Sequence, residues 1–434
     1  MRQFVFLFML LTSLYAEAQK SILLKCGKLL DTKTGIVLEK QFVLLNGNRV
    51  VSVGPTAFKA DSTIDLSDYF VMPGMIDCHT HVLLQGDITQ EDYDVQVLKE
   101  SIPYRTIRGV KSAERALMNG FTTIRDLGTE GAGYADVDIK KAINAGVIPG
   151  PRMLVATLAI NTTGHYPIKT SEYAWELKMP KGVQEITGAD EARRAVREQL
   201  EHGADWIKIY SDRGYIKQPD GNYRALSNFT LEEMNAIGSE TIGSRKNFAA
   251  HAMTRDGIIA AVNAGAKSIE HGLGMDEESM QLMAAKGVFW CPTLFVNEFV
   301  AEGRAKLGSP INLMFSKSIP ETFKKAVKLG VKIAYGTDIG GYDWSLPQAK
   351  DFSYFVSWGL TPIQAMQTAT VHAAELLGQV GQIGEIKAGA LADIIALKQD
   401  PTKNIESLQN IDWIMKDGKA VSYTHLTLPT KRIV

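Results

Sequence analysis

VMPGMIDCHTH, residues 71–81, is an apolar strand-like run that ends in two histidines two positions apart. Side chains along a strand point to the same face at every second residue, so the imidazoles of His79 and His81 share one face. The carboxyl ends of parallel strands are where α/β barrels place their chemistry. The segment therefore predicts a buried strand whose end carries functional groups.

Seven further strand-like segments follow, with helical patterns between them. They lie at Thr122–Arg125, Arg152–Ala156, Trp206–Ile209, Phe248–Ala250, Ser268–Glu270, Val288–Cys291 and Lys332–Tyr335. The clearest helical patterns cover 189–201, 231–244, 256–264 and 321–329. With a first strand at 71–77, this alternation predicts an α/β protein with a (β/α)8 TIM barrel over residues 72–379. A doubly wound open sheet is the structural alternative, but no G-x-G-x-x-G motif follows the first strand.

Both flanks of the barrel have β-strand patterns. Residues 19–71 contain strand candidates at Ile36–Val43 and Val50–Val53, separated by the hairpin signal Asn46-Gly47-Asn48. Residues 380–421 contain two more, at Ala392–Leu397 and Ile411–Met415. Two β-rich ends around a long α/β middle suggest that the two flanks pair, so we expect them to form one small β-sandwich domain.

The first and last residues have distinct compositions. Residues 1–18 combine Arg2, an apolar run and the small residues of Ala16-Glu17-Ala18, which predicts a signal peptide cut after Ala18. We therefore expect export to the periplasm or secretion. A membrane anchor is the alternative, but the run is short for a bilayer, so no stable membrane association is expected after cleavage. Residues 422–434, SYTHLTLPTKRIV, lack related periodicity and are interpreted as a non-native tail.

The composition of the chain limits the kinds of molecule that it is expected to bind. The 434 residues are 45% hydrophobic with a formal net charge of −1, so the chain can bury a large core and shows no basic excess for nucleic acid. Its three cysteines have no regular spacing and predict no disulfide framework. A small-molecule substrate is expected, and a homo-oligomer stays open.

The predicted strand ends carry an unusual set of polar residues. They are His79, His81, Lys208, His251, His271 and Asp338. Four of the eight histidines in the chain fall at these places. Singly, each has an ordinary explanation, such as helix capping by Asp338. Jointly they predict a metal site, for which imidazole and carboxylate ligands favour zinc, with manganese or cobalt as alternatives.

Lys208 lies in the apolar run Trp206-Ile207-Lys208-Ile209. A charged lysine is costly to bury, and burial lowers its pKa and makes the neutral amine available. A neutral amine can take up carbon dioxide to form a carbamate, an anionic group that can bridge two cations. The alternative is a lysine whose ammonium reaches out to an acidic neighbour.

Together these residues resemble the amidohydrolase superfamily. The segment 71–81 is similar to its opening signature, and the order of the strand-end residues resembles its binuclear, carbamylated-lysine subtype. The resemblance covers nearly the whole chain after the predicted signal peptide and is strongest to the imidazolonepropionase-like group that includes Xaa-Pro dipeptidases. It implies two divalent metal ions, one held by His79, His81 and Asp338, the other by His251 and His271, with carbamylated Lys208 bridging them.

The resemblance also implies hydrolysis of a carbon–nitrogen bond by an activated water, with Asp338 as general base and then general acid. His165, Tyr210 and Arg213 are expected to bind a substrate carboxylate or the oxyanion, although Arg213 in a solvated loop is equally consistent. Xaa-Pro or related dipeptides and N-acyl amino acids are the leading substrates. A cyclic-amide hydrolase or deaminase is one alternative, which Lys208 disfavours. A catalytically inactive metal-binding protein is another, which Asp338 disfavours.

Overall fold

The computed structural model describes residues 20–88, 90–164, 172–220 and 223–423. The predicted signal peptide at 1–18, His165, and residues 424–434 of the suspected tail lie outside these ranges. Within them, no helix is both long enough and apolar enough to cross a bilayer.

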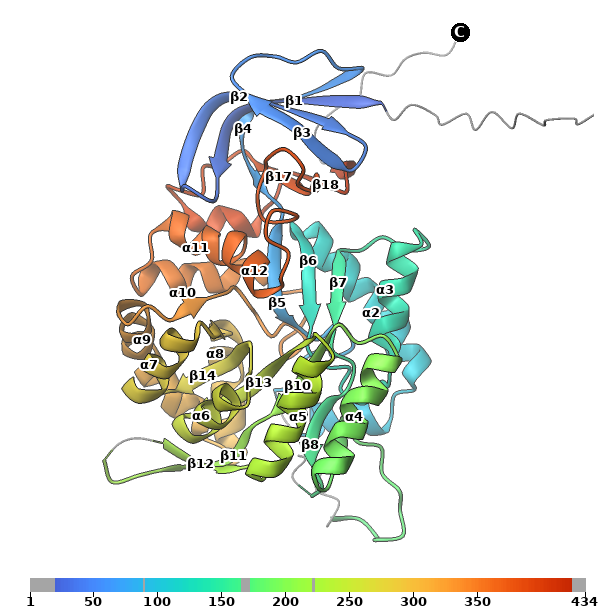
Figure 1. The fold of residues 1–434 in the computed structure, drawn as a ribbon, viewed down its shortest axis with the longest axis vertical. Helices are drawn as coiled ribbons and strands as arrows, with labels where there is room; N and C mark the ends of the chain where they lie inside the picture. The colour runs from blue at the N-terminus through green and yellow to red at the C-terminus, as the bar shows by residue number, and fades with distance from the viewer. Residues whose placement is uncertain (1–19, 89, 165–171, 221–222, 424–434) are drawn as a thin grey trace, which may run out of the picture.

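The two flanks form one seven-stranded sheet at the upper end of the molecule (Figure 1). Its strands are β1 (Ser21–Asp31), β2 (Ile36–Asn46), β3 (Arg49–Gly54), β4 (Ser62–Pro73), β17 (Ile394–Leu397), β18 (Trp413–Lys416) and β19 (Lys419–Tyr423). Their order is β19-β18-β17-β4-β1-β2-β3. The pairing of β4 with β17 joins the flanks, and a hydrogen bond from Val50 N to Ala390 O joins them again at the far edge. Buried apolar residues of both flanks share one core, so the flanks make a single composite domain.

Eight parallel strands form the barrel below this domain. They are β5 (Met75–Thr80), β6 (Phe121–Asp126), β7 (Arg152–Val155), β10 (Trp206–Tyr210), β13 (Asn247–Thr254), β14 (Ser268–Gly274), β15 (Phe289–Cys291) and β16 (Lys332–Ile333). Short strands β8 (Ala159–Thr162) and β9 (Val183–Ile186) extend the sheet beside β10. Backbone hydrogen bonds close both seams, from Cys78 N to Tyr335 O and from Asp205 N to Val155 O, each 2.8 Å. The expected TIM barrel is confirmed.

The expected strand at 71–77 is in fact two strands. β4 ends at Pro73 and belongs to the small domain, whereas β5 begins the barrel at Met75. Gly74 makes this break, because a Cβ on it would lie 2.2 Å from the Thr122 hydroxyl. The eighth strand is also shorter than predicted, since Tyr335 N donates to Thr368 O outside the barrel sheet.

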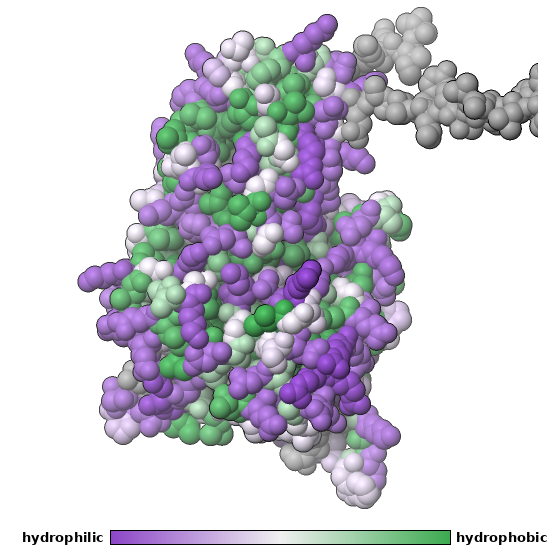
Figure 2. Space-filling view, viewed as in Figure 1, coloured by the Kyte–Doolittle hydropathy of each residue, from purple (hydrophilic) through white to green (hydrophobic). Residues whose placement is uncertain are grey.

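Helices cover the outside of the barrel. They are α1 (Gln90–Leu98), α2 (Ile102–Met118), α3 (Ala135–Asn144), α4 (Ala189–Glu201), α5 (Leu231–Gly243), α6 (Arg255–Asn263), α7 (Glu277–Lys286), α8 (Leu294–Lys306), α9 (Ile311–Lys328), α10 (Asp351–Ser357), α11 (Pro362–Thr368) and α12 (Val371–Leu376). Figure 2 shows mostly hydrophilic side chains over the barrel, with hydrophobic residues in small groups between them, as expected for amphipathic helices. The helix expected at 321–329 begins earlier, at Ile311.

The carboxyl ends of the barrel strands point away from the small domain (Figure 1). At that end, a hairpin of β11 (Asp212–Lys217) and β12 (Tyr223–Ser227) follows β10 directly. The sequence interpretation treated this region as a loop. Its register shifts between Arg213 and Ile216, and such a bulge re-aims the neighbouring side chains.

Candidate metal centre

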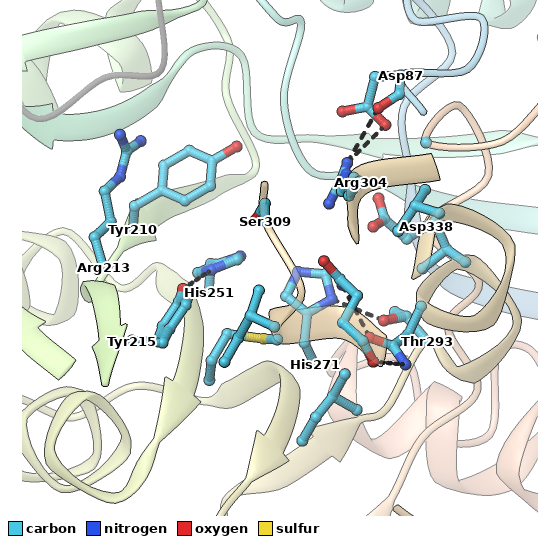
Figure 3. Close-up of a pocket in the computed structure, with 18 of the residues that line it drawn as sticks. Asp87, Tyr210, Arg213, Tyr215, His251, His271, Thr293, Arg304, Ser309 and Asp338 are labelled. Atoms are coloured by element: carbon cyan, nitrogen blue, oxygen red, sulfur yellow. Dashed lines mark hydrogen bonds and ion pairs between the residues drawn. The ribbon is translucent and has the colours of Figure 1, made fainter. Parts of the chain in front are cut away.

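The mouth of the barrel contains a cavity of about 750 Å³ (Figure 3). All six predicted metal ligands line it: His79, His81, Lys208, His251, His271 and Asp338. Tyr210 and Arg213 line it as well, whereas His165 lies outside the described residues. Segments up to 259 residues apart in the sequence thus meet at one site, because each residue lies within or shortly after a parallel strand of the same barrel.

Three of these side chains form a compact cluster. One ligand atom from each of His79, His81 and Asp338 lies within 4.8 Å of the other two. Asp338 Oδ1 is 3.2 Å from His81 Nε2 and 3.5 Å from His79 Nε2. Two imidazole nitrogens and a carboxylate at this spacing could hold one divalent ion.

The hydrogen bonds of His79 fit a metal ligand. Its Nδ1 bonds to Glu270 Oε2 at 2.8 Å, while its buried Nε2 has no hydrogen-bond partner among the described residues. A buried polar nitrogen without a partner is costly unless something else binds it. Since the carboxylate fixes the proton on Nδ1, the Nε2 lone pair is available toward the Asp338 carboxylate, where a cation fits.

His251 and His271 lie beside this cluster. Their ring centres are 4.6 Å apart, and the ring of His271 lies 5.0 Å from that of His79. The Tyr215 hydroxyl lies 3.0 Å from His251 Nε2, and Thr293 Oγ1 lies 2.7 Å from His271 Nδ1. One nitrogen of each ring is therefore held by a hydroxyl, which sets the ring orientation and leaves the other nitrogen for a ligand.

Lys208 is buried in the barrel wall, with 1% of its surface exposed. Burial lowers its pKa, and Arg125 lowers it further, while Glu270, Asp338 and Glu130 act in the opposite direction. Its Nζ lies 5.6 Å from the centre of the Tyr210 ring. The geometry therefore places an amine with weakened basicity in the same cavity as the imidazoles.

The imidazoles differ in their affinity for protons. Burial, followed by the charge of Lys208, lowers the pKa of His79 to about 4 and lowers that of His251 strongly. Burial and the neighbouring His251 lower the pKa of His271 well below its usual range. Burial also disfavours the charged form of His81, but Asp338 reverses this and raises its pKa to about 9. A cation bound there must therefore displace a proton from His81.

Beneath the cluster, a buried ion pair supports His79. Arg125 Nη2 lies 2.9 Å from Glu270 Oε1, and both side chains are fully buried. Burial would raise the pKa of Glu270, but Arg125 and His79 together lower it to about 2. The Glu270 carboxylate therefore stays ionised and keeps the proton on the Nδ1 atom of His79.

Sequence reasoning missed several residues of this site. Glu270 directly precedes a predicted ligand, and a carboxylate inside a buried strand could have signalled it. Glu130 in Gly128-Thr129-Glu130-Gly131 follows the second barrel strand, and its flanking glycines were the available signal. For Asp87, which also lines the cavity, we find no local signal.

These features define a class: a TIM-barrel protein with a candidate metal centre at the carboxyl ends of its strands. The chain belongs to the amidohydrolase family, whose family model matches residues 70–421. This confirms the resemblance seen in the sequence.

Three similar proteins place the chain within this family. Ochratoxinase from Aspergillus niger is 33% identical over 377 residues, which cover 80% of this chain and 75% of that protein. The crystal structure of a Xaa-Pro dipeptidase with bound methionine in its active site has a TM-score of 0.80 and 32% identity, and covers 92% of this chain and 99% of that one. A prolidase crystallised with N-methylphosphonate-L-proline has a TM-score of 0.81 and 27% identity, and covers 93% and 100%. The chain is therefore a hydrolase acting on carbon–nitrogen bonds.

Proposed function

We propose that this protein is a metal-dependent amidohydrolase that cleaves the amide bond of small carboxylate-bearing substrates, Xaa-Pro or related dipeptides and N-acyl amino acids among them. The observation that carries the proposal is the convergence of four imidazoles, a buried lysine and a carboxylate in one cavity. Similarity to a Xaa-Pro dipeptidase and to a prolidase with a proline-containing ligand supports the substrate class.

The proposed centre holds two divalent ions, zinc being the favoured metal. His79, His81 and Asp338 would hold one ion, and His251 and His271 the other. Lys208, as a carbamate, would bridge them. Support comes from the compact cluster around Asp338, the unpartnered Nε2 of His79 and the lowered pKa of Lys208. When bound, the ions would supply a water nucleophile at neutral pH and polarise the scissile carbonyl.

Asp338 is the proposed proton carrier. The imidazoles of His79 and His81 outweigh burial and hold the pKa of Asp338 well below its usual range, so it is ionised at neutral pH. An ionised carboxylate in the cavity can accept a proton from the attacking water and return it to the leaving nitrogen. The chain thus supplies both a base and, after one transfer, an acid at the same oxygen atoms.

The cavity wall next to β10 is proposed to hold the substrate carboxylate. The guanidinium carbon of Arg213 lies 5.5 Å from the centre of the Tyr210 ring, so the ring restricts its position. A guanidinium can bind a carboxylate through two parallel hydrogen bonds, and a tyrosine hydroxyl can add a third. We keep His165 as a further candidate in this role.

The test is a screen of dipeptides and N-acyl amino acids with protein reconstituted with zinc. We expect hydrolysis of carboxylate-bearing amides, two metal ions per chain, and loss of activity on chelation that added zinc restores. One ion per chain together with ammonia release from a cyclic or aromatic amine would support a deaminase. Full metal content with no turnover of any amide would support an inactive metal-binding protein.

We also propose that the chain is exported, on the composition of residues 1–18. Expression in a bacterial host followed by fractionation and amino-terminal sequencing tests this. The expected mature protein begins at Gln19 and is recovered outside the cytoplasm. An uncleaved chain in the cytoplasmic fraction would refute the proposal.

A further inference from the structure

Helices α8 and α9 form an apolar wall on one side of the cavity. Val296 and Val300 line the cavity from α8, and Ile311 and Met314 line it from the first turn of α9. Side chains three or four residues apart on a helix lie on the same face, so each helix presents a pair of apolar side chains to the cavity. Leu273, near the end of β14, lines the cavity as well, and α9 packs against both α8 and β14. We call these five residues the apolar wall.

The polar side chains on this part of the two helices bond to one another. Asn297 and Asn312 also line the cavity, yet they are only 3% and 8% exposed. Asn312 Nδ2 donates to Asn297 Oδ1, and Asn297 Nδ2 donates to Ser316 Oγ, both at 2.9 Å. These bonds hold α8 against α9 and use polar atoms of both amides within the protein. An apolar group can therefore contact the wall without breaking them, whereas a charged group there would lose hydrating water.

The apolar wall begins beside the candidate metal centre. α8 starts directly after Thr293, whose hydroxyl oxygen lies 2.7 Å from His271 Nδ1. Gly341, in the loop after Asp338, lines the cavity too, and a Cβ there would lie 3.0 Å from Val296 Cγ2 and 3.5 Å from Asp338 Oδ2. In Figure 3, Thr293 and Asp338 lie on the same side of His271. Val296 and the Asp338 carboxylate are thus neighbours, because the glycine between them has no side chain to separate them.

The two carboxylate oxygens of Asp338 have different neighbours. Oδ1 lies 3.2 Å from His81 Nε2 and 3.5 Å from His79 Nε2, whereas Oδ2 is the oxygen that lies near Gly341 and Val296. In the proposed function Asp338 returns a proton to the leaving nitrogen, which must then come within about 3 Å of the carboxylate. The group bonded to that nitrogen is therefore brought close to the start of the apolar wall.

We propose that the apolar wall binds the side chain of the residue that leaves with the amide nitrogen, so that the enzyme prefers leaving residues with a large apolar side chain, such as leucine, methionine and phenylalanine. This inference rests on the proposed function. In an amino-acid amide the carbon bonded to the leaving nitrogen carries the side chain, so the subsite for that side chain must start next to the proton carrier. Val296 meets this requirement, and Ile311 and Met314 extend the wall. The cavity of about 750 Å³ has room for such a side chain beside the scissile bond.

The experiment uses a series of substrates that differ only in the leaving residue. The acyl part is that of the substrate cleaved fastest in the screen, and the leaving residue is glycine, aspartate, lysine, proline, leucine, methionine or phenylalanine. With wild-type, zinc-loaded enzyme we expect kcat/KM for the last three to exceed that for glycine, aspartate and lysine by about 10- to 100-fold, the gain typical of burying one large apolar side chain. Proline, whose ring is apolar but smaller, should lie between the two groups.

Two substitutions of Met314, which is half-buried, assign the preference to the wall. Met314→Ala should lower the ratio of kcat/KM for the phenylalanine substrate to that for the glycine substrate by about 3- to 10-fold. Met314→Glu should raise kcat/KM for the lysine substrate relative to the phenylalanine substrate by about 10-fold or more, because a carboxylate in the wall pairs with the ammonium group. Met118→Ala, at an exposed methionine of α2 that does not line the cavity, is the matched control and should leave both ratios unchanged. Zinc content and the thermal unfolding midpoint are measured for each variant.

Two results would overturn the subsite. One is cleavage of the glycine, aspartate or lysine substrate by wild type as fast as that of the phenylalanine substrate, which contradicts the apolar preference while leaving the amidohydrolase function intact. The other is wild-type ratios in both Met314 variants at full zinc content, which would show that the leaving residue does not contact the apolar wall. If zinc-loaded protein cleaves no amide in the screen, the proposed function fails, and this subsite fails with it.

Discussion

Replacing Glu270 with glutamine tests whether the buried ion pair prepares His79 for a metal ion. In the wild type, Glu270 accepts from His79 Nδ1 with one oxygen and from Arg125 with the other. A glutamine offers one acceptor and one donor in the same space. If its amide nitrogen faces His79, the imidazole proton moves to Nε2, the nitrogen assigned to the metal. If the amide turns over, its N–H groups face the Arg125 guanidinium.

The size of the effect follows from the pKa of Glu270, which is about 2 in the folded protein against a usual value of 4.5. That difference corresponds to roughly 3 kcal/mol of folding free energy. Because the folded pKa is the lower one, the stabilisation is present above about pH 4.5 and is lost as the pH falls toward 2. For zinc, loss of a carboxylate behind a histidine ligand weakens binding by about 10- to 100-fold.

Two assays measure these quantities. Urea unfolding of metal-free protein at pH 7 should show Glu270→Gln less stable by about 3 kcal/mol, with a smaller difference from wild type at pH 3. Competition with a chelator should show the weaker zinc affinity. Glu240→Gln is the matched control, because its Arg197 partner is solvent-exposed and such pairs contribute less than about 1 kcal/mol. Wild-type stability and zinc affinity in Glu270→Gln would refute the reasoning.

Three other changes probe the site and the end of the chain. Lys208→Ala should lower the metal content from two ions to one or fewer per chain by elemental analysis, and a full complement would exclude a carbamate bridge. Asp338→Asn should lower kcat by about 10²- to 10⁴-fold in steady-state assays, and an unchanged kcat at full metal content would remove its proton-transfer role. Removal of residues 424–434, which leaves the strand β19 complete to Tyr423, should not alter the thermal unfolding midpoint, and insoluble protein would show that the segment contributes to folding.

The barrel was predictable because its evidence is local. Short apolar runs indicate the strands, and amphipathic patterns between them indicate the helices. The structure has α4 at the predicted bounds, Ala189–Glu201. The break at Gly74 was not predictable, since it depends on the Thr122 side chain of the next strand. The β11–β12 hairpin was missed because Arg213, Gly214 and Tyr215 lack the alternation of a half-buried strand.

The candidate ligands were predictable for a topological reason: residues that end parallel strands meet at one mouth. Their supporting groups were not. Glu270 is tolerated inside the barrel only because Arg125, 145 residues away, pairs with it, and no local pattern reveals such a pairing. Glu130 was missed because its contact with His81 depends on how two separate strand ends meet. Sequence patterns locate the ends of strands, whereas charge compensation inside the barrel follows from the closed fold.

Several residues that line the cavity have strained backbone conformations, which indicates that the fold imposes the positions of the candidate ligands. Eight non-glycine residues in the described ranges have positive φ angles, and four of them line the cavity: Glu130, His271, Thr293 and Asp338. Such conformations cost about 1–3 kcal/mol each. Three of the four end or follow the last strands of the barrel, where Trp290 Nε1 donates to His271 O at 2.6 Å and Asp338 N donates to His79 O at 2.7 Å. Local preference opposes these turns, so packing of the whole barrel must sustain them. The ligand positions are therefore a tertiary property, which explains why substitutions beneath the cavity, as at Glu270, are expected to alter metal binding without touching the metal.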